Sequence, residues 1–177
     1  MEVAANDARR RACRGNARLS RRRGGAPLRP VVPPPLIGAV IAFAMWSVAR
    51  ATPDLDVDLT AWRPIAVAVA AAGLAIDLIS VAAFFRRRTT VNPLTPEKTQ
   101  KLVIDGFYRF SRNPMYLGML LMLIGWALWL GHAFAFAWPA LFVWLINEMQ
   151  IKPEERALEE KFGEAYIAYK RRVRRWI

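Results

Sequence analysis

Apolar residues are concentrated in four runs, at residues 36–49, 65–85, 115–130 and 133–149, and most charged residues lie outside them. A helix rises ~1.5 Å per residue, so a membrane span needs ~20 apolar residues. The second run reaches this length and the first is short. The last two, which Gly131-His132 separates, form either thin, tilted spans or a helical hairpin. The pattern predicts an all-α, polytopic membrane helical bundle with about four transmembrane helices.

Positive charge marks one side of this bundle. Residues 1–35 carry nine arginines, residues 86–112 carry seven lysines or arginines, and residues 150–177 carry eight. The two opposite loops carry only Arg50 and Arg63 beside three aspartates. Cytoplasmic loops are enriched in lysine and arginine. We therefore expect a multi-pass protein of the cell (inner) membrane with both termini in the cytoplasm.

The composition agrees with a membrane protein and excludes several classes of enzyme. Apolar residues make up 55% of the chain, yet lysine and arginine outnumber aspartate and glutamate by 26 to 14. One cysteine, Cys13, excludes an intramolecular disulfide and a zinc site built from cysteines. Because His132 is the single histidine, most zinc sites and catalytic triads are excluded. We expect neither a hydrolase nor a metalloenzyme, and predict no metal.

Residues 1–34 form a basic N-terminal tail, which is disordered by composition. It precedes a membrane domain over residues 35–177. The tail could be a nucleic-acid arm, a tether to anionic lipid, a targeting peptide or the product of an upstream start codon. We favour the tether and the upstream start, because no aromatic residue lies among the cations, which argues against nucleic acid. No small-residue cleavage site follows the apolar run, so the tail is not a secretory signal.

Asp77 is an acidic residue near the middle of the second apolar run. A charge at that depth costs ~2.5 kcal/mol or more on insertion scales, so the side chain needs a partner or a proton. Acids inside a membrane are often functional. The simpler interpretation is a protonated aspartate that is hydrogen-bonded within the bundle, and we leave Asp77 outside the predicted site.

The connector before the third run contains two helix starts. Thr95-Pro96-Glu97 is typical of the first and predicts a short surface helix over residues 97–101. An extended segment at residues 102–104 and a turn at Asp105-Gly106 follow. Asn113-Pro114, again a cap and a first-position proline, opens the third membrane helix.

The second helix start lies within an unusually dense segment, Gly106-Phe-Tyr-Arg-Phe-Ser-Arg-Asn-Pro-Met-Tyr-Leu-Gly118. A helix start alone does not require Tyr108, Arg112 and Tyr116 to crowd the same place. The free amides of a helix start also suit an anionic group of a ligand. We interpret this segment as the edge of a binding site at the membrane surface.

After Pro153 the sequence predicts a highly charged helix with an apolar, aromatic stripe at steps of three and four. Such a helix lies in the interface or covers the bundle. The pair Glu154-Glu155 at its start is explained by the helix dipole. If Glu154 lies where the fourth helix leaves the membrane, however, it borders the helix start at Asn113. The stripe consists of Leu158, Phe162, Tyr166, Tyr169, Val173 and Trp176.

Four motifs occur in order around the short helical hairpin: Gly-x-Tyr, Arg-Asn-Pro-x-Tyr-x-Gly, Glu-Glu-x-x-Leu and Phe-Gly-x-x-Tyr-x-x-Tyr. This ordered set resembles the isoprenylcysteine carboxyl methyltransferase family, and the Thr-Thr-Val-Asn-Pro segment before residue 94 is similar to its bacterial branch. The related phospholipid N-methyltransferases share the C-terminal half. The resemblance covers roughly residues 84–175.

The resemblance implies an integral membrane enzyme that uses S-adenosyl-L-methionine and binds it in the C-terminal half, about residues 86–177. An acid suits the ammonium or the ribose hydroxyls of this cofactor, aromatic rings suit its sulfonium or adenine, and helix-start amides suit its carboxylate. By similarity, the cofactor-binding residues are Lys101, Leu102, Val103, Tyr108, Asn113, Pro114, Met115, Tyr116 and Glu154.

Two positions depart from the pattern of the eukaryotic members. Asn113 stands where they have histidine, so no histidine base is available there; Asn113 and Tyr116 are expected to position the reactants. Gln150 stands where they have an arginine that is taken to clamp the acceptor's carboxylate, and Lys152 is the nearest cation. Arg112 and Gln150 are our candidates for binding the acceptor.

Methyl transfer by in-line displacement needs proximity, alignment and exclusion of water. A carboxylate acceptor needs only positioning, whereas an amine must be unprotonated and no obvious base is present, which slightly favours a carboxylate or other anionic or soft acceptor. The sequence thus predicts an S-adenosyl-L-methionine-dependent membrane methyltransferase. Its acceptor would be a lipophilic small molecule or prenylated compound from the bilayer. The alternatives are a phospholipid N-methyltransferase and a non-catalytic membrane protein that retains the fold. We expect membrane lipids as partners and no nucleic acid.

Overall fold

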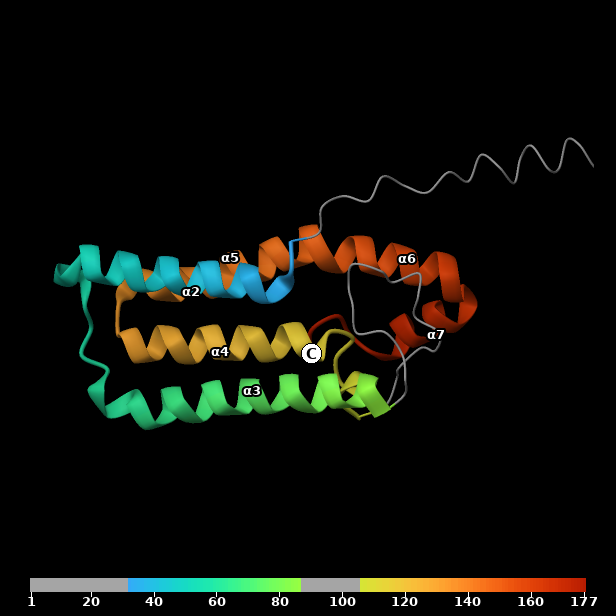
Figure 1. Ribbon diagram of the computed structural model, residues 1–177, viewed down its shortest axis with the longest axis horizontal. Coiled ribbons are helices and arrows are strands. Elements are labelled where there is room, and N and C mark those ends of the chain that lie inside the picture. The colour runs from blue at the N-terminus through green and yellow to red at the C-terminus, as the bar shows by residue number, and fades with distance from the viewer. Residues whose placement is uncertain (1–31, 87–105) are drawn as a thin grey trace, which may run out of the picture. The chain divides into compact units, whose positions relative to one another are not determined.

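The computed structural model describes residues 32–86 and 106–177, and these residues form helices joined by turns (Figure 1). Within them the sole strand-like pairing is one backbone bridge between Asp56 and His132. The α-helices are α2 (Pro34–Ala51), α3 (Arg63–Arg86), α4 (Pro114–Leu130), α5 (Ala137–Ile146), α6 (Lys152–Phe162) and α7 (Glu164–Arg172). Short 3-10 turns lie at Pro53–Leu55, Thr60–Trp62, Gly106–Arg109 and Ala133–Phe136.

Three helical stretches in the described ranges are long and apolar enough to cross a membrane: Pro34–Ala51, Thr60–Ala83 and Ala133–Phe162. The helix α4 is also apolar but shorter. The predicted all-α membrane bundle is confirmed, while the number of four spans stays a prediction. The predicted helix at residues 97–101 and the extended segment after it lie outside the described residues.

The helix formed by the fourth apolar run does not end at Met149, where the sequence pattern predicted its end. A π-helical turn, Asn147–Ile151, joins α5 directly to α6, so that one helical stretch continues to Phe162. Pro153 does not break this stretch, because it lies in the first turn of α6 after the π turn.

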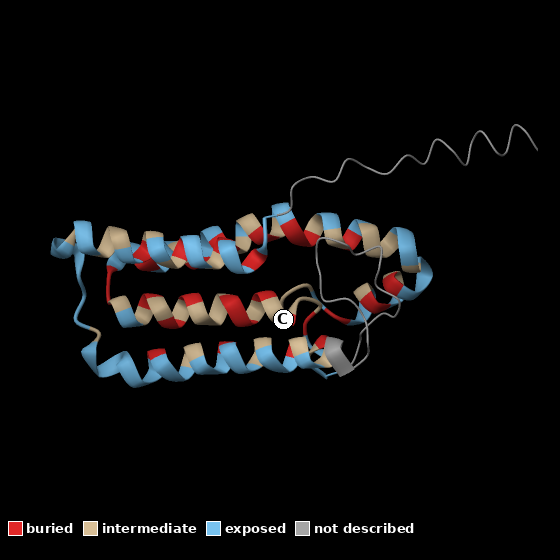
Figure 2. Cartoon of the chain, in the orientation of Figure 1, coloured by how far each residue is buried: buried red, intermediate tan, exposed pale blue. Residues whose placement is uncertain are grey.

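The helix α4 lies between α3 on one side and the pair α2 and α5 on the other (Figure 1). Its neighbours bury the largest apolar side chains of the core, Met45, Phe142 and Ile146, with almost no exposure. Figure 2 shows the outer faces of α2 and α3 as largely exposed. These faces carry large apolar side chains such as Phe43 and Leu78, as expected of surfaces that contact lipid.

Small residues let α3 and α4 approach closely. A Cβ atom on Gly118 would lie 2.6 Å from the carbonyl oxygen of Gly73, and one on Gly125 would lie 2.7 Å from that of Ala66. Close backbone approach through small residues is a common way for membrane helices to pack. This contact fixes the position of the first turns of α4 against α3.

We expect Gly125→Ala to destabilise the protein by ~1–3 kcal/mol, because the added methyl group would overlap the α3 backbone. Unfolding in detergent, followed by circular dichroism, measures the change. The matched control is Gly38→Ala, since nothing lies within 4 Å of a Cβ atom there; alanine should be neutral or slightly stabilising within a helix. Equal stabilities of the two variants would contradict the close packing.

The loops at the far end of α4 are joined through His132. Its ring is fully buried, and Nε2 lies 3.0 Å from Thr52 Oγ1 and 3.1 Å from the Thr52 carbonyl oxygen. Gly131 ends α4 with a positive φ of 62°, and its carbonyl accepts a hydrogen bond from the Val57 amide. A cavity of about 350 Å³ at this end is lined by Asp58, among others, and therefore lies away from the residues predicted to bind a cofactor.

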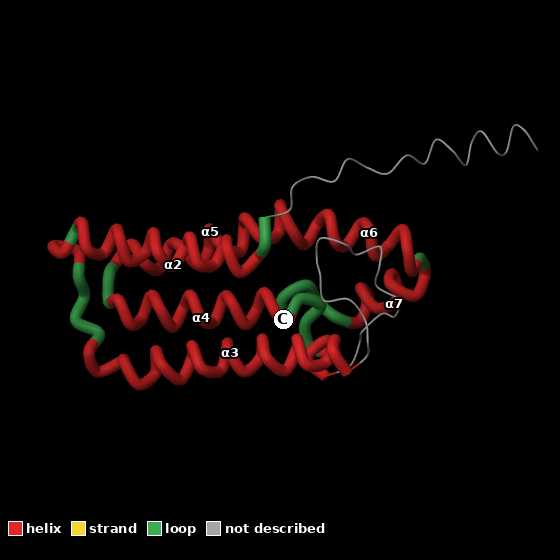
Figure 3. Tube along the Cα trace, in the orientation of Figure 1, coloured by secondary structure: helices red, strands yellow, loops and turns green. Residues whose placement is uncertain are grey.

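The charged C-terminal helix is two helices, not one. Gly163 has φ 52° and ψ −127° and turns the chain between α6 and α7 (Figure 3). Residues after Arg172 leave the helix and run back to the start of α4. The stripe is therefore divided: Tyr166, Tyr169 and Val173 form their own buried cluster with Leu158 and Phe162, whereas Trp176 packs against the main core.

Candidate functional site

The start of α4 and the start of α6 come together through Tyr116 and Glu154. Each is the third residue of its helix, and the Tyr116 hydroxyl donates a hydrogen bond of 3.2 Å to Glu154 Oε2. The tyrosine is buried, with 7% of its surface exposed, and the glutamate is partly buried. Two residues that are 38 positions apart in the sequence thus meet at one point, as the prediction of a shared site requires.

Tyr108 lies close to this pair. It is buried in the 3-10 turn before α4, where its backbone carbonyl accepts a 2.7 Å hydrogen bond from the Tyr169 hydroxyl. Burial raises the pKa of the Tyr108 hydroxyl well above its ordinary value, and the charge of Glu154 raises it further. Tyr108 is therefore a neutral phenol at physiological pH.

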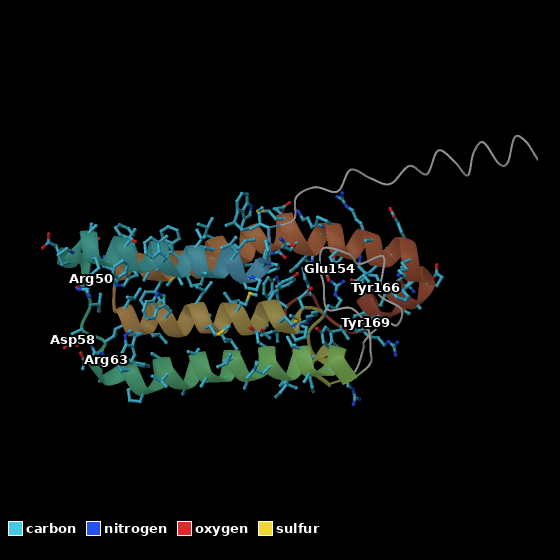
Figure 4. The ribbon with its side chains drawn as sticks, viewed as in Figure 1. Arg50, Asp58, Arg63, Glu154, Tyr166 and Tyr169 are labelled. Carbon is cyan, nitrogen blue, oxygen red and sulfur yellow. The ribbon has the colours of Figure 1, made fainter. Side chains whose placement is uncertain are left out.

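The aromatic cluster of α7 contacts the turn that carries Tyr108. Burial raises the pKa of Tyr169 to about 12, although the positive charge of Arg112 acts in the opposite direction. Its hydroxyl therefore keeps the proton that it donates to Tyr108. Figure 4 shows Glu154, Tyr166 and Tyr169 at one end of the helices, with Arg50, Asp58 and Arg63 at the other.

Asn113 occupies the N-cap position of α4, but its side chain does not cap the helix. Its Nδ2 donates a 3.0 Å hydrogen bond to the Arg175 carbonyl instead. Its own amide donates to Ser111 Oγ at 3.1 Å. The N-cap position is as predicted, but capping by the side chain is not: Asn113 fastens the C-terminal segment to the start of α4, and no pattern in the sequence indicated the contact with Ser111.

Arg112 forms an ion pair with Glu155, whose position in the sequence was explained by the helix dipole alone. Its Nη1 lies 3.0 Å from Glu155 Oε1, and both side chains are 10% exposed or less. Arg175 binds the same carboxylate through two nitrogens, at 3.1 and 2.7 Å. These hydrogen bonds raise the pKa of Arg175 above its ordinary value. Glu155 and Arg175 adjoin the predicted site residue Arg112, and no local pattern in the sequence indicated these contacts.

Gln150, the other candidate for binding the acceptor, and Lys152, the cation nearest to it in the sequence, have partners of their own. Gln150 is buried in the π turn, and its Nε2 donates a 2.6 Å hydrogen bond to the carbonyl of Val32, two residues before α2 begins. Lys152 forms an exposed ion pair with Glu148, one turn earlier. Both cations considered for the acceptor are therefore paired with an acid, Arg112 with Glu155 and Lys152 with Glu148.

The remaining predicted residues divide between the described and undescribed parts of the chain. Pro114 is buried at the first position of α4, and Met115 beside it is half-buried. Lys101, Leu102 and Val103 lie outside the described residues. The cofactor roles assigned to all of these residues stay predictions.

A model of the phospholipid methyltransferase family matches residues 62–165, more than half of the chain. The chain belongs to this family. The matched range includes Tyr116 and Glu154, so the hydrogen-bonded pair lies within the family's shared region. Membership in the phospholipid methyltransferase family confirms the resemblance inferred from the ordered motifs.

Relatives of known name match shorter stretches. The chain is 34% identical over 77 residues to a protein-S-isoprenylcysteine O-methyltransferase B of Arabidopsis thaliana, covering 44% of this chain and 39% of that protein. It is 36% identical over 75 residues to the protein-S-isoprenylcysteine O-methyltransferase of Homo sapiens, covering 42% of this chain and 26% of that protein. The chain therefore matches well under half the length of these named relatives.

A small protein matches over its whole length. An uncharacterized protein of Haemophilus influenzae is 49% identical over 63 residues, which are 36% of this chain and 100% of that protein. No solved structure matches the chain.

Proposed function

We propose that this protein is an S-adenosyl-L-methionine-dependent methyltransferase that acts within a membrane on a lipophilic acceptor. The observation that carries the proposal is the hydrogen bond between Tyr116 and Glu154, which joins the starts of α4 and α6 within the range that the phospholipid methyltransferase family matches.

The residues around this contact fit the cofactor's chemistry. S-adenosyl-L-methionine carries an ammonium and ribose hydroxyls, which the Glu154 carboxylate can bind, and a carboxylate, which suits the first amides of α4. The buried rings of Tyr108 and Tyr116 offer faces to a sulfonium or an adenine. When bound, the cofactor supplies an activated methyl group.

The chain's own part in such a reaction is to bind, orient and exclude water. The C-terminal segment covers the start of α4, where the Arg112 amide donates to the Arg174 carbonyl and Asn113 binds the Arg175 carbonyl. Trp176 Nε1 donates to Asn147 Oδ1 in the π turn and holds the segment against α5 and α6. Proximity and exclusion of water are the main requirements of a direct methyl displacement.

The names of the family and of its relatives indicate two classes of acceptor. One is a carboxylate of a prenylated compound, and the other is an amine of a phospholipid. Arg112 is the cation that a carboxylate acceptor would need, and Glu155 already neutralises it. This observation supports phospholipid N-methylation as a candidate beside O-methylation. Both reactions place the acceptor at a site that opens toward lipid in the cell (inner) membrane.

Calorimetric binding of S-adenosylhomocysteine to the full chain in detergent tests the proposal. We expect binding in the micromolar range or tighter by folded wild-type protein, because the demethylated cofactor keeps the ammonium, carboxylate, ribose and adenine. A wild type that is folded by circular dichroism and does not bind would exclude the methyltransferase and favour a non-catalytic role.

A further inference from the structure

The buried acid of α3 leaves no space for a ligand. Asp77 Oδ1 is inaccessible to solvent and has no hydrogen-bond partner among the described residues. The interpretation of Asp77 as hydrogen-bonded within the bundle is not supported by the contacts of Oδ1. This oxygen packs against α4, since a Cβ atom on Gly118 would overlap it. Exposed charge that the described residues do not neutralise lies instead at the surface, at the end of the bundle where α4 begins.

The last turn of α7 and the residues that follow are strongly basic. Five of the six residues from 170 to 175 are lysine or arginine. Two of these five, Lys170 and Arg175, pair with glutamates of α6. The other three are exposed and form no ion pair within the described ranges: Arg171, Arg172 and Arg174.

The fold returns these charges to the level at which α4 enters the membrane. The carbonyl of Arg174 accepts a 3.0 Å hydrogen bond from the Arg112 amide, and the carbonyl of Arg175 accepts one of 3.0 Å from Asn113 Nδ2. Asn113 directly precedes α4, and Figure 1 shows the C-terminus beside the start of this helix. The exposed cations of the C-terminal segment therefore lie at the depth of the lipid head groups.

The turn before α4 adds a cation and an aromatic ring at the same level. Arg109 is exposed and forms no ion pair with the described residues. Phe110 is 74% exposed, more than any other aromatic side chain whose burial is described. Aromatic residues are enriched where a membrane meets water. Because the Arg112 amide binds the C-terminal segment, the turn and this segment form one continuous surface.

We propose that this surface binds anionic phospholipids of the adjoining leaflet and thereby holds the C-terminal segment across the start of α4. Lipid bound here is a structural partner, not the group that receives the methyl. We name this surface the basic rim, and it consists of Arg109, Phe110, Arg171, Arg172 and Arg174.

The chemistry of the basic rim suits phosphate groups at a bilayer surface. A guanidinium donates two parallel hydrogen bonds to a phosphate. Each cation beside an anionic leaflet strengthens attachment by about fivefold, and salt screens this attraction. Phe110 can enter the boundary of the acyl chains, where its exposed ring loses contact with water. A nucleic acid is a poorer partner, since the rim lies where the bilayer itself already meets the protein.

Attachment of the rim to lipid also concerns the proposed site. Arg175 binds Glu155, which follows Glu154 in the first turn of α6. A segment that is held in place keeps water from the helix starts where Tyr116 donates to Glu154. We therefore expect anionic lipid to tighten binding of the cofactor. This consequence rests on the proposed function, whereas the contact with lipid does not.

The first measurement detects anionic lipid at the rim directly. The full chain carries Cys13→Ser and Ile177→Cys, and an uncharged fluorophore is attached at position 177, where Ile177 is 76% exposed and a label displaces little. The protein is placed in vesicles of phosphatidylcholine and phosphatidylglycerol. A trace of one of the two lipids bears a nitroxide near the top of its acyl chain. The ratio of quenching by the two labelled lipids gives the local enrichment of phosphatidylglycerol.

We expect phosphatidylglycerol to be enriched around wild type, and the variant Arg171→Gln with Arg174→Gln to lower this enrichment ~10-fold or more. Glutamine at position 174 keeps the hydrogen bond of the backbone carbonyl, so the segment should still fold. The matched control removes two charges at the opposite end of the helices, through Arg50→Gln with Arg63→Gln (Figure 4), and should equal wild type. High salt should abolish the enrichment.

The second measurement is calorimetric binding of S-adenosylhomocysteine in nanodiscs of phosphatidylcholine, with and without phosphatidylglycerol. Wild type should bind about fivefold more tightly when phosphatidylglycerol is present, which corresponds to the contribution of one cation at an anionic surface. The variant Arg171→Gln with Arg174→Gln should bind equally in both membranes.

Each contrary outcome identifies which claim fails. Equal quenching by the two lipids, or an enrichment that the double variant retains, overturns the basic rim. Displacement of phosphatidylglycerol by RNA at physiological salt would assign the rim to nucleic acid and also overturn it. Enrichment of phosphatidylglycerol without tighter binding of S-adenosylhomocysteine overturns the effect on the site. If folded wild type binds no S-adenosylhomocysteine in either membrane, the proposed function fails, while the quenching still decides whether the rim binds lipid.

Discussion

Replacement of Glu154 by glutamine should weaken binding of S-adenosylhomocysteine by about 100-fold, which corresponds to loss of one charged hydrogen bond in a shielded site. Glutamine has nearly the same shape and can still accept the hydrogen bond from Tyr116, so the packing of α6 on α4 should survive. What disappears is the negative charge that would face the cofactor's ammonium or ribose. Calorimetry on the full chain in detergent measures the change.

Two further variants locate the source of this effect. Tyr116→Phe removes the hydroxyl that donates to Glu154 and keeps the ring; it should weaken binding by less than Glu154→Gln. Glu160→Gln alters an exposed glutamate on the same helix and should bind as wild type does. If Glu154→Gln bound S-adenosylhomocysteine with wild-type affinity, the cofactor would not contact this carboxylate, and the assignment of the site would be wrong.

The architecture could be predicted because it depends on long apolar runs and on the length of a membrane span. The runs at residues 36–49 and 65–85 correspond to α2 and α3, each extended by a few residues at its ends. Helix ends depend on local turns rather than on hydrophobicity, which explains these small differences. The first position of α4 was predictable from Pro114, since proline is favoured there.

The path of the chain after residue 146 was not predictable from the same signals. A π turn has no distinctive composition, so the continuous stretch through Asn147–Ile151 could not be anticipated. The break at Gly163 did leave a signal, because glycine after the last helical residue commonly ends a helix. The regular spacing of the aromatic stripe concealed it, since Tyr166 and Tyr169 pack with Leu158 across the corner.

The candidate site was predictable to the extent that it depends on local motifs. Tyr116 and Glu154 were both predicted to bind the cofactor, and the structure joins them by a hydrogen bond. The contacts with Arg175 and Ser111 depend on where the C-terminal segment returns, which no local pattern specifies. For the same reason Asp77 could not be assigned a neighbour: its position opposite Gly118 follows from the close packing of α3 on α4.

Glu155→Ala should destabilise the protein by ~3 kcal/mol or more, because it leaves two arginines close together without their shared anion in a largely buried place. Glu155 is 6% exposed, and Arg112 Nε and Nη1 are buried without a hydrogen-bond partner among the described residues apart from the ion pair of Nη1 with Glu155. The same change should release the C-terminal segment, which Arg175 ties to Glu155. Unfolding of the detergent-solubilised chain, followed by circular dichroism, measures the stability.

Glu159→Ala is the matched control, since Glu159 pairs with Lys170 where both side chains are about a third exposed. Exposed ion pairs contribute ~1 kcal/mol or less, so this variant should remain close to wild type. A small effect of Glu155→Ala, equal to that of Glu159→Ala, would mean that water or lipid head groups replace the lost anion. In that case the ion pair with Glu155 would position the side chain of Arg112 without contributing to the free energy of unfolding.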